Sequence, residues 1–290
     1  MNSSIISFNA KDNTILNGVI YKNDMKTNKV LIQVHGMTSN CFKIRNQIIA
    51  ETIASIKIDT IDFNNRGSEI IKYISDGKTK KLAGTAYENI EECYYDIVGA
   101  IEYAKSLRYE EIYIQCHSLG ATKVVYAYNQ LLKEKSNLLN HIKGIILLSL
   151  VDIPGIVDQN SNTDYKKIAE EKEKNNEIME MMPLRSFIHP ISVKNYLKYV
   201  KYNDNIDFAK YDDKNNKFIE LNNIKCPLFM RWGNKNELIK QNAEKLSDFI
   251  NSKIDNNDKD ISFIDGADHG YHDKEQLLAY EIKRFLIQNL

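Results

Sequence analysis

Glu111-Ile-Tyr-Ile-Gln-Cys-His-Ser-Leu-Gly120 is the stretch from which the rest of the chain can be interpreted. Residues 111–116 have the apolar pattern of a buried strand, and residues 119–134 carry apolar side chains at helical spacing. A serine at a sharp turn between a strand and a helix has an exposed hydroxyl, and the N–H of the next residue faces the same space. Ser118 is therefore the candidate nucleophile and Leu119 a candidate oxyanion donor; the alternative is an ordinary helix start.

Strand and helix patterns alternate on both sides of this stretch. Strands are predicted at 4–9 and 14–21 (a hairpin), 29–34, 57–63, 111–116, 143–150, 226–232 and 260–264, and helices at 42–54, 88–107, 119–134 and 273–288. This alternation predicts an α/β fold with a mainly parallel central sheet and helices on both faces. Ligands of such sheets bind at the carboxyl ends of the strands.

One segment, residues 153–222, breaks the alternation. It contains a charged stretch and then a helix with Val193, Tyr196, Leu197 and Val200 on one face. We expect a helical cap or lid (153–222) inserted into a core formed by 1–152 and 223–290, the alternative being a solvated helical excursion. Four apolar side chains of this segment would line a pocket or fill a core: Met179, Met181, Met182 and Phe187.

Two further motifs follow predicted strands. His35-Gly36-Met37 comes directly after strand 29–34, where the N–H of Met37 is a candidate second oxyanion donor. Gly266-Ala267-Asp268-His269-Gly270 comes after strand 260–264, and a histidine there can reach a serine hydroxyl as a general base. His269 is therefore the candidate base, with His272 as its nearest competitor.

The remaining histidines are assigned no catalytic role. His141 and His189 lie outside the pattern of strand ends, and the side chain of His117 is expected to point away from Ser118.

The acid that would orient the histidine is the least determined position. It is expected in the loop Gly233-Asn-Lys-Asn-Glu-Leu-Ile239 after strand 226–232, because a carboxylate fixes the imidazole tautomer. Asn236 stands where an aspartate is usual, and Glu237 is next to it. Glu237 is the candidate acid, and Asp152 and Asn236 are the alternatives.

The charge composition limits the kinds of partner. The 290 residues include 39 Lys and Arg against 39 Asp and Glu, and this balance predicts no general nucleic-acid partner.

The remaining composition bears on location and cofactors. The start of the chain lacks the pattern of a signal peptide. Asp152 and Pro154 interrupt the most apolar stretch (144–157), so we expect no membrane span. The four cysteines form no CxxC pair and are expected to be free thiols of a cytoplasmic protein. The six histidines show no tight metal-ligand spacing, so no metal or cofactor is expected.

Together these motifs resemble the α/β-hydrolase superfamily over nearly the whole chain. The order Ser118, acid, His269 matches it, and three segments resemble a group of hydrolases within it: Phe63-Asn-Asn-Arg-Gly67, Gly84-Thr-Ala-Tyr-Glu88 and Gln115-Cys-His-Ser-Leu-Gly120. The resemblance implies a structural role for Arg66 beside the active-site loop. Cys116 in place of glycine and Asn236 in place of aspartate depart from the usual pattern.

The predicted function is that of a serine hydrolase acting on a small-molecule carboxylic ester or thioester through an acyl-enzyme. Ser118 would attack the carbonyl, His269 would move the proton, Glu237 would orient His269, and the N–H groups of Met37 and Leu119 would hold the oxyanion. Two alternatives are an acyltransferase with the same centre and a binding protein without turnover. The acyl group, the leaving group and the oligomeric state stay open.

Overall fold

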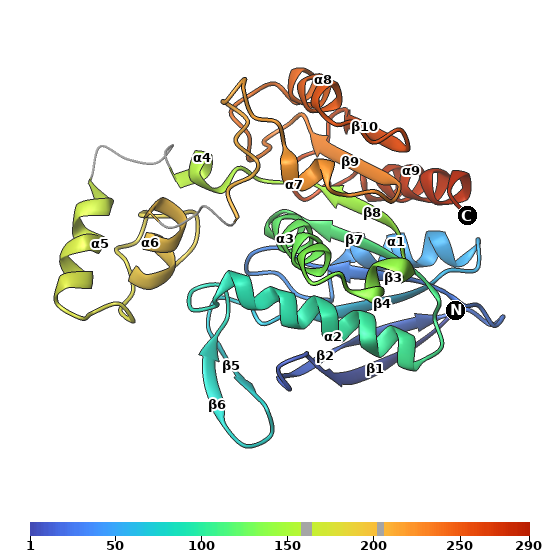
Figure 1. The fold of residues 1–290 in the computed structure, drawn as a ribbon, viewed down its shortest axis with the longest axis horizontal. Coiled ribbons are helices and arrows are strands. Elements are labelled where there is room, and N and C mark those ends of the chain that lie inside the picture. The colour runs from blue at the N-terminus through green and yellow to red at the C-terminus, as the bar shows by residue number, and fades with distance from the viewer. Residues whose placement is uncertain (158–163, 202–205) are drawn as a thin grey trace.

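An eight-stranded sheet runs through the middle of the structure, a computed structural model that describes residues 1–157, 164–201 and 206–290 (Figure 1). In spatial order its strands are β1 (Asn2–Asn9), β2 (Ile15–Lys22), β4 (Asp59–Asn64), β3 (Lys29–Val34), β7 (Glu111–His117), β8 (Ile142–Leu148), β9 (Leu228–Gly233) and β10 (Lys259–Ile264). The pairs β1–β2 and β2–β4 are antiparallel, and every neighbouring pair from β4 to β10 is parallel. The predicted mainly parallel sheet is confirmed.

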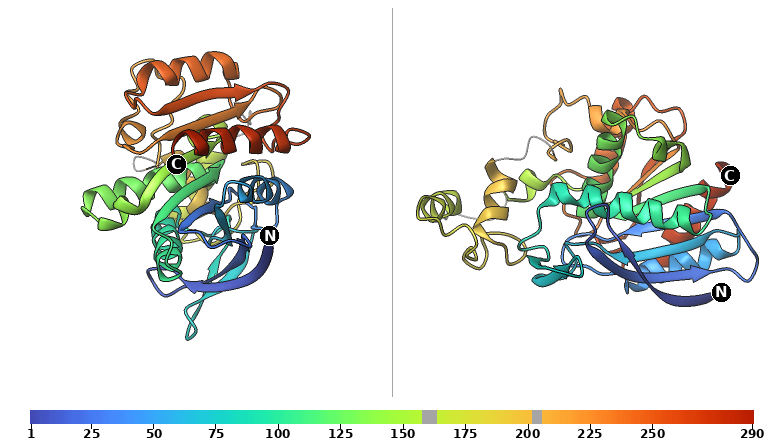
Figure 2. Two further views of the ribbon diagram at one scale, coloured as in Figure 1. Left: turned by 90° about the vertical axis from the view of Figure 1, so that its right-hand side faces the viewer. Right: turned by 60° about the horizontal axis from the view of Figure 1, so that its bottom comes forward.

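Helices cover both faces of this sheet, as Figures 1 and 2 show. On one face α1 (Ile44–Ala54) and α9 (Glu275–Gln288) share an apolar cluster with the sheet. On the other face lie α2 (Cys93–Ser106), α3 (Leu119–Lys133) and α8 (Ala243–Lys253). Two short 3-10 helices, η1 (Ile90–Glu92) and η2 (Asn137–His141), precede α2 and β8. Both faces of the parallel strands are therefore buried.

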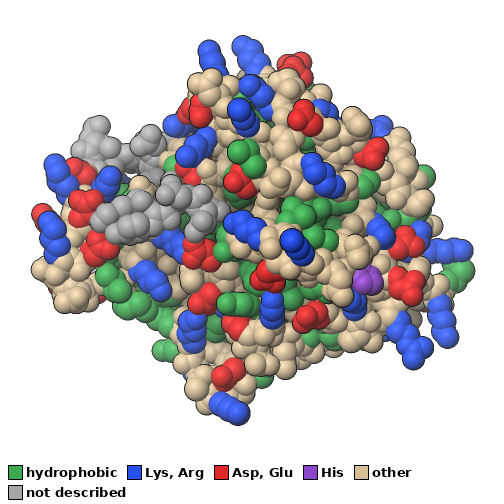
Figure 3. Space-filling view, in the orientation of Figure 1, with side chains coloured by type: hydrophobic (Ala, Val, Ile, Leu, Met, Phe, Trp, Pro, Cys, Tyr) green, Lys and Arg blue, Asp and Glu red, His purple; other side chains and the backbone are tan. Residues whose placement is uncertain are grey.

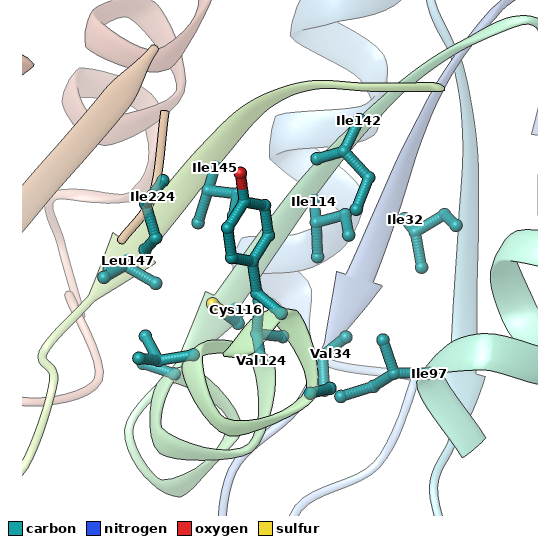
Figure 4. Close-up of a cluster of buried hydrophobic side chains, with 14 of the residues drawn as sticks. Ile32, Val34, Ile97, Ile114, Cys116, Val124, Ile142, Ile145, Leu147 and Ile224 are labelled. Atoms are coloured by element: carbon teal, nitrogen blue, oxygen red, sulfur yellow. The ribbon is translucent and has the colours of Figure 1, made fainter. Parts of the chain in front are cut away.

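The core explains why residues 111–120 occupy the centre. Successive side chains of a strand point to opposite faces, so Ile114 and Cys116 face α3 while Tyr113 packs on the α1 side. Figure 4 shows Cys116 close to Val124 of α3, among aliphatic side chains of β3 and β8. A small thiol fits here, where β7 and α3 approach each other.

The sequence did not predict every element of the structure. Strands β5 (Lys72–Ser75) and β6 (Lys80–Ala83) form a separate antiparallel hairpin that projects from the body of the protein (Figure 1). Helix α8 lies in a region to which no element was assigned.

Between β8 and β9 the chain forms the helices that we call the insertion: α4 (Ile153–Val157), α5 (Tyr165–Lys174), α6 (Val193–Lys201) and α7 (Ile219–Asn222). In Figures 1 and 2, α5 and α6 lie beyond the end of the sheet that β8 points to. Backbone and side-chain hydrogen bonds tie α6 to the segment before α2, from Ser192 N to Ala86 O at 3.1 Å and from Asn195 Nδ2 to Thr85 O at 3.1 Å. The insertion is thus attached next to the carboxyl ends of the strands.

The surface reflects the balanced charge of the sequence. On the face shown in Figure 3, basic and acidic side chains are interspersed, and neither sign dominates an area. Within the described ranges, no helix combines the length and the apolar character needed to cross a membrane.

Candidate active site

Ser118 occupies a strained turn between β7 and α3. Its backbone has φ 56° and ψ −128°, a conformation that costs a residue with a side chain about 1–3 kcal/mol. Two hydrogen bonds of 2.8 Å hold the turn, from Ser118 N to Leu148 O and from Ala121 N to Ser118 O. Gly120 permits it, because a Cβ at that position would lie 2.5 Å from Val34 O. The structure therefore presents Ser118 at the end of the strand.

His269 connects Ser118 to a carboxylate. Its Nε2 lies 2.9 Å from Ser118 Oγ, and its Nδ1 is hydrogen-bonded to Glu237 Oε1. The three side chains come from three separate loops, after β7, β9 and β10. A carboxylate at Nδ1 keeps the proton there and leaves the Nε2 lone pair free to accept the serine hydroxyl proton.

The Glu237 carboxylate is held by several donors. Its side chain is only 3% exposed, and it accepts hydrogen bonds from Ser149 Oγ at 2.7 Å and from the backbone N–H of Gly233 at 3.0 Å and of Leu238 at 2.9 Å. Burial alone would raise the pKa of Glu237. The hydrogen bonds from His269, Ser149 and Gly233 outweigh burial and lower this pKa below its usual value of 4.5. Glu237 is therefore ionised at neutral pH.

The two alternative positions for the acid are placed differently. Asn236 has a left-handed backbone (φ 52°), which asparagine adopts more readily than most residues, and its side chain is exposed. Asp152 accepts a hydrogen bond from Gly155 N at 3.1 Å instead. Among the hydrogen bonds of the described residues, neither side chain reaches the His269 ring.

The loop after β3 lies directly against Ser118. A Cβ on Gly36 would lie 2.9 Å from Ser118 Cβ, so the loop and the serine are in close contact. His35 Nδ1 donates to Gly36 O at 2.8 Å, and His35 Nε2 accepts from Asn65 N at 3.1 Å. Burial lowers the pKa of His35 to about 3, so the ring is neutral and has the tautomer that these bonds require.

This arrangement orients two N–H groups. In a trans peptide the C=O and N–H point in opposite directions, so the His35 bond to Gly36 O turns the N–H of Met37 away from His35. Leu119 is the first residue of α3, and the first N–H groups of a helix have no partner within it. Both residues line the cavity that contains Ser118.

That cavity has a volume of about 500 Å³. Its walls come from the β3–α1 loop and the start of α1, from the insertion, and from the His269 loop. The lining combines apolar side chains with about as many polar or charged ones. The apolar ones are Met37, Phe42, Ile44, Leu119, Val151, Ile153, Phe187, Ile188 and Leu238, and the others are Thr38, Ser39, Lys43, Arg45, His117, Ser118, His189, His269, His272 and Glu275. Such a lining suits a partly apolar organic ligand.

The four apolar side chains named in the insertion have different surroundings. Of these four, Phe187 lines the cavity. Met182 is buried in the apolar cluster between the insertion and the core, and Met179 is half exposed. Neither of these two, nor Met181, is among the lining residues.

Several residues of the site were missed or misjudged from the sequence. His117 lines the cavity, and its Nε2 lies 2.7 Å from the backbone O of His269, so it supports the loop of that residue. Burial lowers the pKa of His117 well below 6.5, so its ring is neutral and donates this bond. His189 also lines the cavity. Ser149 follows β8 directly, and that position at a strand end is the signal that could have identified it.

His272 and Arg66 have other partners. His272 is exposed and pairs with Asp268 at 2.7 Å. Arg66 is buried and pairs with Asp96, Asp12 and Glu92 at 2.7, 3.0 and 2.6 Å, away from the cavity lining.

A second buried ion pair lies beneath the β3–α1 loop. Lys123 Nζ lies 2.6 Å from Glu88 Oε2 and 3.1 Å from Asn65 Oδ1, and Asn65 Nδ2 donates to His35 O at 3.1 Å. The segments 63–67 and 84–88 therefore support the loop that carries Met37.

Comparison with known proteins supports the assignment of the fold. No protein-family model and no curated protein matches the sequence. Among solved structures, Est1E from Butyrivibrio proteoclasticus with bound ferulic acid has a TM-score of 0.68 at 17% identity, covering 97% of this chain and 98% of its own. The α/β hydrolase GrgF from Penicillium sp. sh18 has a TM-score of 0.68 at 13% identity, covering 100% and 99%. An esterase from Pyrococcus furiosus has a TM-score of 0.61 at 15% identity, covering 99% and 91%. From this likeness and from its mainly parallel sheet, we conclude that the chain has the α/β-hydrolase fold.

Proposed function

We propose that the protein is a serine hydrolase that cleaves a carboxylic ester or thioester through an acyl-enzyme. The observation that carries this proposal is the chain of hydrogen bonds from Ser118 through His269 to Glu237 at the wall of a cavity. A serine paired with a base, which is itself oriented by a carboxylate, is the arrangement that activates a hydroxyl for attack.

In the first half of the reaction, Ser118 Oγ attacks the substrate carbonyl carbon. His269 Nε2 takes the hydroxyl proton, and ionised Glu237 stabilises the resulting imidazolium. The carbonyl oxygen becomes an oxyanion, which the N–H groups of Met37 and Leu119 hold. When the tetrahedral intermediate collapses, His269 gives the proton to the departing alcohol or thiol. In the second half, water attacks the acyl-serine by the same steps.

The insertion forms the cap of this site in our proposal. Phe187 and Ile188 line the cavity, and an apolar cluster joins the insertion to Leu119, next to Ser118. Covering a site in this way excludes water and strengthens the hydrogen bonds made to the oxyanion.

Labelling and turnover together test the proposal. We expect a fluorophosphonate probe to label the wild-type protein at Ser118 and p-nitrophenyl butyrate to be hydrolysed. Ser118→Ala should abolish labelling and lower kcat roughly 10⁴-fold or more. A wild-type protein that is folded by circular dichroism but shows neither labelling nor turnover of esters or thioesters would refute the proposal.

A further inference from the structure

One cationic side chain of the cavity has no role in the steps above. Arg45, the second residue of α1, is only 7% exposed, yet it lines the same cavity as Ser118. Among the residues that the structure describes, three of its five N–H donors have acceptors. Nε and Nη2 donate to Asn46 Oδ1 at 3.3 and 3.2 Å, and Nη1 donates to Gly270 O in a long bond of 3.4 Å. The guanidinium therefore keeps donors free for a ligand.

The charge of Arg45 is not neutralised by an ion pair with any of the described residues. Within the described part of the chain, no carboxylate oxygen lies within 4.0 Å of its nitrogens, in contrast to Arg66, which has three such partners. A buried charge without a partner is costly, and proteins normally pair such groups. A ligand anion would supply the missing partner.

The acidic groups that face Arg45 do not replace that partner. Asp62 is linked to it only through Asn46, whose Nδ2 donates to Asp62 Oδ2 at 2.8 Å, and burial raises the pKa of Asp62 well above 3.8. Asp268 is engaged with His272 and with Gly270 N at 3.0 Å. Glu275 lines the cavity but forms no ion pair with Arg45 among the described residues.

A second cation stands near the same wall. Lys43, two residues before Arg45, also lines the cavity and is exposed. Exposed Phe42 and Ile44 flank it, so this wall combines two positive charges with apolar surface. A ligand that matches it has an apolar chain or ring and one anionic group.

We propose that the natural substrate is an ester or thioester that also carries a carboxylate, which Arg45 binds with assistance from Lys43. This inference rests on the proposed hydrolase function and adds the substrate class to it. Arginine suits the task because its planar fork can bind a carboxylate through two parallel hydrogen bonds. The carboxylate belongs either to the acyl part or to the leaving group, and the experiment separates the two.

The test compares kcat/KM for matched acidic and neutral esters. In the acyl arm, the mono-p-nitrophenyl ester of adipic acid is compared with p-nitrophenyl hexanoate. In the leaving-group arm, p-butyryloxybenzoate is compared with its methyl ester. We expect the wild-type ratio of acidic to neutral substrate to exceed about 10 in one arm, since hydrogen bonds to charged groups typically contribute factors of roughly 10 to 100.

Variants then assign the preference to Arg45. Arg45→Gln should lower the ratio to about 1, and Arg45→Lys should retain part of it because the charge remains. Arg284→Gln, on the exposed side of α9, removes the same charge away from the cavity and should leave the wild-type ratio unchanged. The readout is the ratio of kcat/KM for the acidic and the neutral ester. An Arg45 variant that loses activity equally on both esters therefore keeps the wild-type ratio and is not mistaken for the expected result.

The outcomes separate this inference from the proposed function. Turnover of the neutral esters without an acidic preference in either arm overturns the inference and leaves the hydrolase intact. A wild-type preference that survives in Arg45→Gln also overturns it, because Arg45 then only supports the Gly270 loop. Absence of both fluorophosphonate labelling and turnover overturns both proposals.

Discussion

The length of the Glu237 side chain allows it to hydrogen-bond to His269. The preceding residue, Asn236, adopts a left-handed backbone, and the chain then turns so that the longer glutamate side chain extends to His269 Nδ1. Ser149 and Gly233 fix the carboxylate in that position. An acid one residue away from the usual position is therefore compatible with the same hydrogen-bond chain.

Removing the charge of Glu237 tests this interpretation. Glu237→Gln should lower kcat by roughly 10³- to 10⁴-fold, because the amide cannot stabilise the imidazolium and favours the wrong tautomer of His269. Asn236→Ala and Asp152→Asn serve as matched controls and should stay within about threefold of the wild type. Steady-state hydrolysis of p-nitrophenyl butyrate measures all three, and a larger loss in Asp152→Asn than in Glu237→Gln would refute the assignment.

His35 gives a prediction for pH. Burial lowers its pKa from 6.5 to about 3, so the unfolded chain binds a proton that the folded chain excludes. The stability due to neutral His35 is therefore complete above about pH 6.5 and is lost progressively as the pH falls toward about 3.

The substitution His35→Asn removes the imidazole ring and with it the pH dependence of stability that His35 causes. The variant should be less stable than the wild type at about pH 7, and the gap should shrink by roughly 1–3 kcal/mol at about pH 4. Urea unfolding at both pH values measures the gap. A gap that is equal at the two values would contradict a neutral buried imidazole.

At the scale of elements, the site depends on how closely α3 approaches β3. The first turn of α3 lies against the end of β3, with the position of a Gly120 Cβ only 2.5 Å from Val34 O and 2.7 Å from His35 O. Both contacts are with backbone, which cannot move aside as a flexible side chain can. The start of α3, which carries Leu119, and the end of β3, from which the Met37 loop departs, are therefore fixed relative to each other.

Gly120→Ala should push these elements apart. We expect a loss of about 1–3 kcal/mol in the free energy of unfolding. We also expect a lower kcat, since the two N–H groups that we propose as oxyanion donors separate. Gly144→Ala is the control, because its new Cβ meets the ring of Tyr113 at 3.1 Å instead of backbone and should cost less. If urea unfolding gave the same loss of stability for Gly120→Ala and Gly144→Ala, the backbone contact at Gly120 would not be the cause of the loss.

The elements also show what sequence could and could not predict. The buried strands β3, β7, β8 and β9 were predicted because apolar runs bounded by loops leave little ambiguity. Strands β5 and β6 were missed because a hairpin outside the main sheet buries few side chains and so lacks a clear alternation.

Some residues of the site could likewise be predicted from the sequence and others could not. Ser118 and His269 stand at strand ends and could be named as candidates, whereas the burial of Arg45 depends on contacts with Gly270, distant in sequence. No local pattern encodes such a contact. The hydrogen bond of His117 to the backbone O of His269 likewise depends on where the His269 loop lies.

At the scale of the whole molecule, the insertion is joined to the core by an apolar cluster of its own. Leu197 and Tyr199 of α6 are buried in it together with Leu119 of α3 and Ile90 of η1. This cluster is distinct from the two clusters that line the faces of the sheet. We therefore expect the insertion to lose stability without unfolding the sheet.

Leu197→Ala should weaken this attachment by about 2–4 kcal/mol through the cavity that it leaves. Hydrogen exchange should then accelerate in residues 164–201 while amides of β7 and β8 stay protected. Leu131→Ala in α3, a residue of the main core, is the matched control and should speed exchange in the sheet as well. Faster exchange of β7 and β8 in Leu197→Ala would show that insertion and sheet unfold together.

The adjacency of β8 and β9 has an evolutionary consequence. These strands are parallel neighbours, and the insertion departs at the end of one and returns to the start of the other. Changes in the length or sequence of this excursion therefore leave the pairing of the two strands intact. A lineage with this architecture can acquire new ligand preferences by exchanging one contiguous block of coding sequence, while Ser118, Glu237 and His269 stay in place on the core.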